Sequence, residues 1–230
     1  MSSLQTCLKA EFQWTWLGRV PYGRAWELQE ALRRRILEEE WPDCLLLLEH
    51  DPVVTIGRHG SKSNILLPRE ELSLRGVEVV ESSRGGDVTY HGPGQLVGYP
   101  VFRVPKGPRA HVRMIGEALR RVCAEAGVAA EWTEDPLGLW VGRDKIAAFG
   151  LHVSRGVAIH GFALNVTTAL EAFDWIVPCG LRARGVTSLK RLVGDRFSPE
   201  GIAPRVARVL AEVSGRVAVQ VEPACVWSAL

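Results

Sequence analysis

The chain has 230 residues, of which 47% are hydrophobic and 23% charged, and its formal net charge at pH 7 is +2. That composition is typical of a globular protein long enough to bury a sizeable core, in one large domain or two small ones. The small net charge gives no sign of a nucleic-acid-binding surface, which would need basic residues gathered on one face. The sequence has no signal-peptide pattern and no apolar run of about 18 residues, so we expect a cytoplasmic protein without a membrane span.

The first half of the chain alternates predicted strands and helices. A strand is expected over 8–20, and a helix should begin at Pro21, because proline suits the first turn, and end near Trp41. The apolar run 44–49 predicts a strand buried on both faces. Further elements are then expected in chain order: a turn and a returning strand over 50–58, a short helix over 68–72, and strands over 77–81 and 95–102.

The second half predicts a long helix, a meander and a closing helix and strand. The long helix should run from Pro108 to about Ala126, where Gly127 ends it. The meander is expected over 137–141, 145–153 and 157–166, and the closing helix and strand over about 199–221. No repeat or low-complexity linker divides the chain. We therefore predict one domain, 1–230, of the α/β (α+β) class, with a mixed β-sheet and flanking helices.

The five cysteines are odd in number and irregularly spaced, and none forms a C-x-x-C pair. This pattern predicts neither a disulfide framework nor a zinc site, and no metal ligand set is expected. Cys44 and Cys123 fall on apolar stretches and are interpreted as packing residues. Cys179 differs, because it stands between Pro178 and Gly180 in a predicted loop, where a sulfur can be exposed beside a backbone N–H donor.

The stretch 84–99 contains five glycines together with Arg84, His91 and Gln95. Because glycine allows close backbone approach, this stretch indicates a loop brought against a flat or extended ligand. The alternative is a glycine-rich connection that buries a histidine.

A nucleophilic Cys179 would need a group that favours its thiolate near pH 7. His91 and His160 lie in glycine-flanked segments and could form a Cys–His pair. Lys145 begins an apolar strand, where burial could lower its pKa and its charge could favour the thiolate. The alternatives are satisfied core or loop histidines and a lysine in a solvent-exposed turn. Sequence spacing alone does not choose among them.

Four blocks of the sequence, in one order, resemble the signature of a known family. They are Arg84-Gly85-Gly86 with Thr89-Tyr90-His91-Gly92-Pro93-Gly94-Gln95 and Tyr99, then Lys145-Ile146-Ala147-Ala148-Phe149-Gly150, then His160-Gly161-Phe162-Ala163-Leu164-Asn165-Val166, and finally Pro178-Cys179-Gly180 with Val186-Thr187-Ser188-Leu189. On these blocks the chain is similar to the lipoyl(octanoyl) transferases. Phe149 and Phe162 depart from the pattern, because a smaller aliphatic residue is expected there, and the change would reshape an acyl tunnel.

The resemblance implies an acyltransferase of protein lipoylation with the fold of the biotin and lipoate protein ligases. Such an enzyme takes an octanoyl or lipoyl group from acyl carrier protein and places it on a lysine ε-amine of a lipoyl domain. The implied acceptors are the lipoyl domains of 2-oxoacid dehydrogenase complexes and the glycine cleavage H protein. No cofactor, nucleic acid or membrane is implied.

The resemblance also implies roles for individual residues. Cys179 would carry the acyl thioester, and Lys145 would lower the pKa of its thiol. The residues implied to line the substrate are Arg84, Gly85, Gly86, Asp87, Val88, Thr89, Tyr90, His91, Ala148, Phe149, Gly150, Gly161, Phe162 and Ala163.

The nearest alternative is an ATP-dependent lipoate or biotin protein ligase on the same fold. Such ligases activate a free acid as an adenylate and need no cysteine, so the Pro-Cys-Gly loop and Lys145 argue against them. A second alternative is a non-enzymatic module that binds the carrier protein and leaves Cys179 inert.

Overall fold

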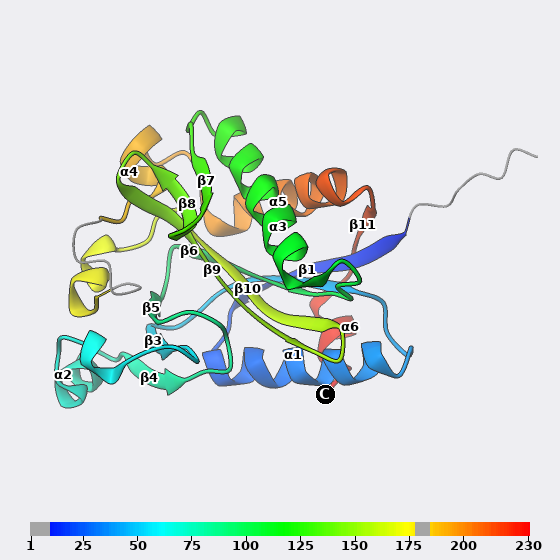
Figure 1. Cartoon of the computed structure of the whole chain (residues 1–230), viewed down its shortest axis with the longest axis horizontal. Coiled ribbons are helices and arrows are strands. Elements are labelled where there is room, and N and C mark those ends of the chain that lie inside the picture. Colours follow the sequence, from blue (N-terminus) through cyan, green and yellow to red (C-terminus); the bar gives the residue numbers. More distant parts are fainter. Residues whose placement is uncertain (1–9, 178–184) are drawn as a thin grey trace, which may run out of the picture.

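Eight strands form a central mixed sheet in the computed structural model, which describes residues 10–177 and 185–230 (Figure 1). Their order is β11-β1-β2-β6-β10-β9-β8-β7, with β11, β1 and β2 parallel and the remaining neighbours antiparallel. The bounds are β1 (Glu11–Arg19), β2 (Cys44–Glu49), β6 (Gln95–Val101), β7 (Glu131–Glu134), β8 (Leu137–Val141), β9 (Asp144–Ser154), β10 (Val157–Asn165) and β11 (Val217–Gln220). The predicted α/β class with a mixed sheet is confirmed.

A second sheet of three short strands lies beside the first (Figure 1). It consists of β4 (Glu78–Glu81), β3 (Val53–Ile56) and β5 (Val88–His91) in that order, with β3 parallel to β4 and antiparallel to β5. The strand expected after the turn at 50–52 therefore forms, but it joins this small sheet. Residues 88–91, interpreted from the sequence as loop, are a strand, because Val88 and Tyr90 alternate into the core under this sheet.

Long helices cover both faces of the central sheet. Figure 1 shows α1 (Tyr22–Leu37) below the sheet, and α3 (Gly107–Glu125) and α5 (Pro199–Ser214) above it. The apolar run in β2 serves both faces, since successive side chains of a strand point in opposite directions. Leu45 and Leu47 pack with α3 and α5, whereas Leu46 and Leu48 pack with α1. The prediction that this strand is buried on both faces is confirmed.

The remaining helices are short. They are η1 (Lys62–Asn64), α2 (Arg69–Leu74), η2 (Leu170–Trp175), α4 (Leu189–Val193) and α6 (Pro223–Trp227). The sequence analysis anticipated α2 but named no element at α4, α6 or the edge strand β7. Cys44 and Cys123 are buried in the core, as predicted. Among the described residues, no helix combines the length and apolar character needed to cross a membrane.

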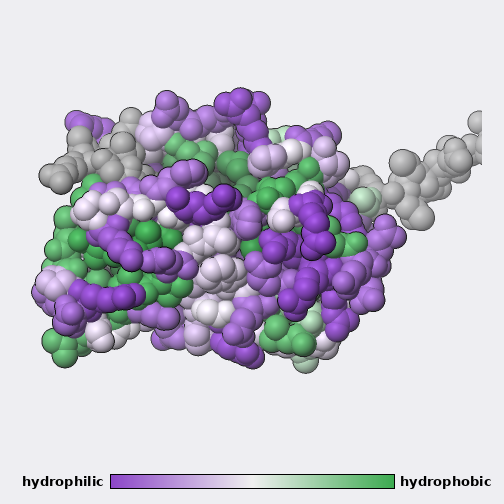
Figure 2. All heavy atoms as spheres, turned by 60° about the horizontal axis from the view of Figure 1, so that its bottom comes forward, coloured by the Kyte–Doolittle hydropathy of each residue, from purple (hydrophilic) through white to green (hydrophobic). Residues whose placement is uncertain are grey.

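The small-sheet end of the molecule carries exposed apolar surface. Figure 2 shows hydrophobic residues gathered at this end, crossed by hydrophilic side chains. Leu74, at the end of α2, is 90% exposed, and Leu66 is 53% exposed. The Lys62–Glu81 ion pair, with an N–O distance of 2.7 Å, lies at the surface of the same region.

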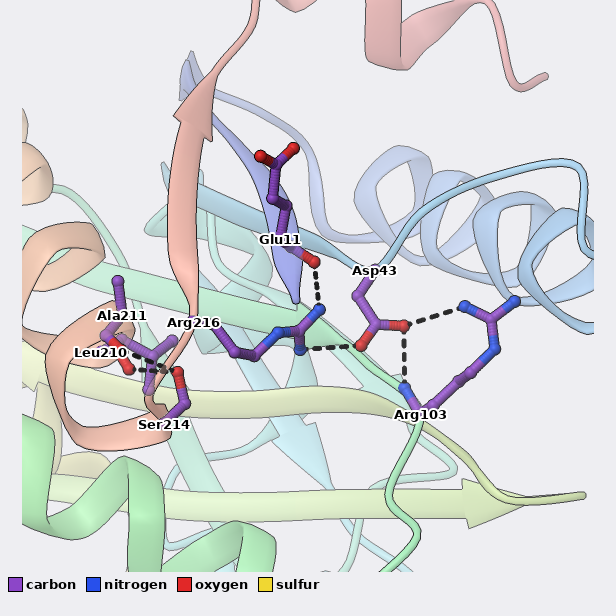
Figure 3. Close-up of polar contacts among 7 residues, drawn as sticks. All are labelled: Glu11, Asp43, Arg103, Leu210, Ala211, Ser214 and Arg216. Carbon is purple, nitrogen blue, oxygen red and sulfur yellow. Dashed lines mark hydrogen bonds and ion pairs between the residues drawn. The ribbon is translucent and has the colours of Figure 1, made fainter. Parts of the chain in front are cut away.

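Asp43 joins four neighbouring strands of the central sheet at one of its ends (Figure 3). Its carboxylate accepts hydrogen bonds from the Arg103 backbone N–H at 3.1 Å and from the Arg216 guanidinium at 2.8 Å. Its backbone carbonyl accepts one from the Gln13 N–H at 2.9 Å. The Arg216 guanidinium also donates to the Glu11 carbonyl. One buried carboxylate thus fixes the adjoining ends of β1, β2, β6 and β11.

Removing this carboxylate should destabilise the fold. Asp43→Ala removes the charge partner of Arg216, whose side chain is only 17% exposed. We therefore expect the free energy of unfolding to fall by about 2–4 kcal/mol. Urea denaturation followed by circular dichroism measures the change. The matched control is Glu27→Ala, which breaks the ion pair between Arg24 and Glu27, two exposed side chains. It should lower the free energy of unfolding by no more than about 1 kcal/mol. Equal losses in the two variants would show that Asp43 does not fix the strand ends.

Candidate functional site

A cleft lies where the small sheet meets β6, β9 and β10, and it encloses about 490 Å³ with the open space at its mouth included. The lining residues are Tyr22, Arg84, Gly86, Asp87, Val88, Thr89, His91, Val97, Tyr99, Ala148, Phe149, Gly150, His160, Gly161, Phe162 and Ala163. The structure therefore brings together five stretches of the chain, at 22, 84–91, 97–99, 148–150 and 160–163. All the residues predicted to bind substrate line this cleft except Gly85 and Tyr90. Substrate binding by these residues stays a prediction.

Gly85 and Tyr90 lie behind the wall of the cleft. The Gly85 N–H donates to the Leu151 carbonyl at 2.9 Å, which attaches the glycine turn to β9. Tyr90 packs edge-to-face against Phe173 and Trp175 under the small sheet. Both residues support the wall.

Two glycines in the wall allow backbone to approach backbone. A Cβ atom added to Gly161 would lie 2.2 Å from the Gly98 carbonyl oxygen, and one added to Gly150 would lie 2.9 Å from the Gly85 carbonyl oxygen. Any other residue at either position would push apart the segments that form the cleft.

Arg84 shapes the turn beside the cleft. Its guanidinium donates to the Thr55 side chain at 2.9 Å, to the Thr55 carbonyl at 2.7 Å and to the Asp87 carbonyl at 2.7 Å. These bonds hold the turn over 84–87 against β3. Through these three bonds Arg84 supports the shape of the cleft wall.

Histidine and tyrosine rings crowd the buried side of the cleft. His50 bonds the Val20 carbonyl through Nδ1 at 2.7 Å and the Tyr99 hydroxyl through Nε2 at 2.6 Å. His91 bonds the Gln95 side chain at 2.7 Å and stacks on Tyr22, with ring centroids 6.2 Å apart. The sequence analysis missed His50 and Tyr22. No sequence signal identified them, because one follows a buried strand and the other begins a helix.

Burial keeps these histidines neutral at physiological pH. It lowers the pKa of His50 from 6.5 to about 4 and that of His160 to about 3. It also holds the pKa of His91 well below 6.5, with His50 and Arg84 adding to the effect. Away from the cleft, burial lowers the pKa of His111 to about 4. The rings near the cleft can donate or accept hydrogen bonds, but at pH 7 they do not supply positive charge.

The fold should lose stability in mild acid because of these rings. Between pH 6.5 and about 4 the unfolded chain binds more protons than the folded one, so the free energy of unfolding falls as pH falls, by up to about 1.4 kcal/mol per pH unit for each histidine. We expect a much lower urea midpoint at pH 5.5 than at pH 7.5. His111→Phe should reduce this pH dependence of the free energy of unfolding by the contribution of one histidine. A urea midpoint that stays constant over this pH range would contradict the conclusion that the buried histidine rings stay neutral in the folded protein.

Lys145 lies beside a smaller cavity next to the cleft. Thr89, Ala148 and Ala163 line both spaces, so they form the wall that the two share. Lys145 as a whole residue is 8% exposed, and its Nζ lies 4.8 Å from the centroid of the Trp140 ring. The alternative of a lysine in a solvent-exposed turn is therefore wrong.

Residues 185–187 lie directly beside Lys145. The Lys145 N–H donates to the Gly185 carbonyl at 2.9 Å, and its carbonyl accepts from the Thr187 N–H at 3.0 Å. Asn165 fixes the same segment, because its side chain donates to the Thr187 carbonyl at 3.0 Å. Cys179 lies outside the described residues, so its predicted role stays a prediction.

A metal centre finds no support in the described part of the chain. Within 10–177 and 185–230, no three His, Cys, Asp or Glu side chains are grouped so that they could hold a metal ion. The polar side chains that line the cleft are those of Tyr22, Arg84, Asp87, Thr89, His91, Tyr99 and His160.

Comparison with known proteins identifies the family. The sequence model of the lipoyl protein ligase A/B catalytic domain matches residues 21–211. The chain belongs to the lipoyl protein ligase A/B family. Within this family it is 48% identical to an octanoyltransferase of Caldicellulosiruptor bescii, over 87% of this chain and 90% of that one. It is 46% identical to an octanoyltransferase of Koribacter versatilis, over 84% and 80% of the two chains. The chain is therefore an acyltransferase.

Solved structures in the lipoyl protein ligase family share the fold. A lipoate-protein ligase A bound with ATP superposes with a TM-score of 0.75 at 18% identity, covering 95% of this chain and 92% of that one. A bipartite lipoate protein ligase from Thermoplasma acidophilum gives a TM-score of 0.74 at 18% identity, over 96% and 90% of the two chains. The expected ligase-like fold is confirmed. At these identities the likeness concerns the fold alone.

Proposed function

We propose that this enzyme transfers an octanoyl or lipoyl group from acyl carrier protein to a lysine ε-amine of a lipoyl domain, through a thioester on Cys179. The observation that carries the proposal is a largely apolar cleft that shares a wall with the Lys145 cavity, in a chain 44–48% identical to octanoyltransferases. The cytoplasm remains the expected compartment, on the sequence argument alone.

The cleft suits the alkyl part of the substrate. Its apolar lining includes Val88, Val97, Phe149 and Phe162. Burying an eight-carbon chain contributes roughly 6 kcal/mol at about 0.8 kcal/mol for each CH2 group. Phe162 covers Gly98, where an added Cβ would lie 2.1 Å from the ring. This large side chain, which departs from the family pattern, narrows the space that the alkyl chain would occupy.

The first half-reaction would move the acyl group onto the enzyme. The Cys179 thiolate would attack the thioester carbonyl of the carrier, so that a new C–S bond forms and the bond to the carrier sulfur breaks. The departing carrier sulfur would take a proton from cationic Lys145, which becomes neutral. One thioester replaces another, so no ATP is needed. The cationic form of Lys145 would favour the thiolate, and the neutral rings of the cleft leave no histidine cation to compete for this role.

The second half-reaction would release the product. The acceptor amine attacks the acyl thioester, an amide bond forms, and Cys179 leaves as thiolate. The proton lost by the amine passes to neutral Lys145, which acts as the general base. Lys145 suits both steps because the residue is nearly buried and because its backbone N–H and carbonyl both hydrogen-bond to the segment 185–187.

The ligase alternative has less support. The family includes ligases, and one ligase structure similar in fold contains ATP, but this similarity is at 18% identity. The similarity at 44–48% identity is to octanoyltransferases. ATP-dependent acylation that survives Cys179→Ala would favour a ligase, and octanoyl transfer without ATP would exclude one.

A covalent octanoyl group on Cys179 is the first result to seek. After incubation with octanoyl-acyl carrier protein, intact mass spectrometry should show one added octanoyl group that hydroxylamine removes, and peptide mapping should place it on Cys179. Cys44 is the control, because its thiol is buried and burial raises its pKa. Cys44→Ser should still be acylated on Cys179, whereas Cys179→Ser should form no thioester. A thioester that persists elsewhere in Cys179→Ser would refute the assignment.

Substitutions of Lys145 separate charge from proton transfer. Lys145→Ala should slow acyl-enzyme formation and acyl transfer at least a hundredfold each. Lys145→Arg keeps the charge but cannot lose a proton near pH 7, so it should retain part of the thiol reactivity and transfer poorly. The measurements are the pH profile of Cys179 alkylation and single-turnover transfer from preformed octanoyl-enzyme. Lys190→Ala, at an exposed lysine, is the control. An alkylation profile unmoved by Lys145→Ala would exclude Lys145 as the thiolate partner.

A further inference from the structure

Two buried carboxamide side chains lie beside Lys145. Gln95 and Asn165 both line the Lys145 cavity, and they are only 2% and 4% exposed. They pair across the neighbouring strands β6 and β10, and Gln95 Nε2 donates to Asn165 Oδ1 at 3.0 Å. Two apolar side chains of the same shape could fill this space without the cost of burying amides. The role of the two amides therefore depends on where their hydrogen bonds lead.

The hydrogen bonds of the two amides have a fixed direction. Asn165 Nδ2 donates to the Thr187 carbonyl at 3.0 Å, so Oδ1 is the Asn165 atom that faces Gln95. Gln95 presents its Nε2 to Asn165 and its Oε1 to His91 Nδ1, which lies 2.7 Å away. Because a carboxamide oxygen only accepts, His91 Nδ1 carries the proton. Each amide thus has one orientation, and a continuous series of bonds joins His91 in the cleft to Thr187.

This series of bonds ends on the segment 185–187, which forms one side of the Lys145 cavity. The segment lies beside Lys145 in a parallel bridge and hydrogen-bonds to both backbone groups of the lysine. The approach is close, because a Cβ added to Gly185 would lie 2.3 Å from the Asp144 side chain. Val186 lines the cavity together with Lys145. A shift of this segment would therefore move one wall of the cavity relative to the lysine.

We propose that Asn165 is a positioning residue, which fixes the segment 185–187 against the backbone of Lys145 and so keeps the lysine in place beside the nucleophile. This inference rests on the proposed function, in which Lys145 acts on Cys179. Cys179 stands six residues before Gly185 in the sequence. A bond that fixes 185–187 beside Lys145 therefore also fixes one end of the stretch that leads to the nucleophile. Asn165 acts through Lys145 and touches no reacting atom.

The pH profile of Cys179 alkylation tests this role. Asn165→Leu keeps the size of the side chain but removes its hydrogen bonds. The apparent pKa of Cys179 should rise toward the free value of about 8.5, because the charge of Lys145 is no longer held near the thiol. Single-turnover transfer from preformed octanoyl-enzyme should slow about tenfold or more, since small misplacements of a reacting group are costly. KM for octanoyl-acyl carrier protein should stay within about twofold, because Asn165 does not line the cleft.

A double-mutant cycle separates this role from a general loss of structure. If Asn165 acts through Lys145, Asn165→Leu should have little further effect on the alkylation profile of an enzyme that already carries Lys145→Ala. An equal rise in the apparent pKa of Cys179 with and without Lys145 would overturn the proposal. An Asn165→Leu profile identical to that of the unaltered enzyme would overturn it as well.

Thr168→Val is the matched control. Thr168 is 5% exposed, and its hydroxyl donates to the Gly94 carbonyl at 3.1 Å, so this substitution also removes a buried side-chain bond to a backbone carbonyl. Thr168 lies three residues beyond Asn165 but does not line the Lys145 cavity. Its alkylation profile should match that of the unaltered enzyme. A shift as large as that of Asn165→Leu would show that Asn165 has no special role.

A second variant keeps the proposal testable if Asn165→Leu does not fold. The double substitution Gln95→Met/Asn165→Leu replaces both carboxamides with apolar side chains of similar shape, so neither amide is left buried without the other. It should raise the apparent pKa of Cys179 in the same way, and the rise should again depend on Lys145. An unchanged alkylation profile in this folded variant would refute the role of Asn165.

Failure of the proposed function would be distinct from failure of this inference. An unaltered enzyme that is not acylated by octanoyl-acyl carrier protein would refute the proposed function. Normal acylation of Cys179, together with an alkylation profile that Asn165→Leu does not change, would refute the role of Asn165 alone.

Discussion

The turn over 84–87 is attached to two sheets at once, and the cleft depends on this attachment. The Arg84 guanidinium bonds Thr55 in the small sheet, while the Gly85 N–H bonds Leu151 in the central sheet. These bonds therefore connect the small sheet to β9 across the wall of the cleft. Arginine suits this position because its planar group carries several donors in fixed directions and can reach oxygens on separate segments.

Polar groups inside the cleft are compatible with an apolar substrate because they mostly satisfy one another. The Tyr99 hydroxyl bonds His50, and the Tyr22 hydroxyl bonds Ser82 at 2.6 Å. A neutral, internally bonded cluster costs little to bury and does not attract counter-ions. In the proposed function, the charge that acts on the Cys179 thiol comes from Lys145 and from none of these rings.

Local patterns predicted most of the elements, because hydrophobic periodicity and proline or glycine positions are properties of short segments. The strand 44–49 and the helix that follows Pro21 are examples. The same patterns could not place β3 in a separate sheet, since that choice depends on pairing with β5, whose residues lie 32 to 38 positions further along the chain. They also missed β5, where two apolar residues stand among glycines, and α4 and α6, which are too short to show a period.

The site was predicted unevenly for a similar reason. Glycines that allow close approach occur in recognisable runs, so the walls of the cleft could be named from the sequence. Tyr22 and His50 could not, because each stands alone in its segment and meets the others only after folding. The burial of Lys145 was one of two readings that the sequence left open, and its contacts with Trp140 and the segment 185–187 decided between them.

The pairing of β1 with β11 has a consequence for how the protein is made. Glu11 pairs with Val217, so the outer side of β1 is satisfied by a strand about 200 residues further along the chain. Until residues 217–220 emerge from the ribosome, the backbone N–H and C=O groups along that side of β1 are open to pairing with other chains. The growing chain therefore exposes an unpaired, aggregation-prone strand edge for most of its synthesis. An early stop in translation that removes β11 would leave a product inclined to aggregate, even though every residue that lines the cleft is present.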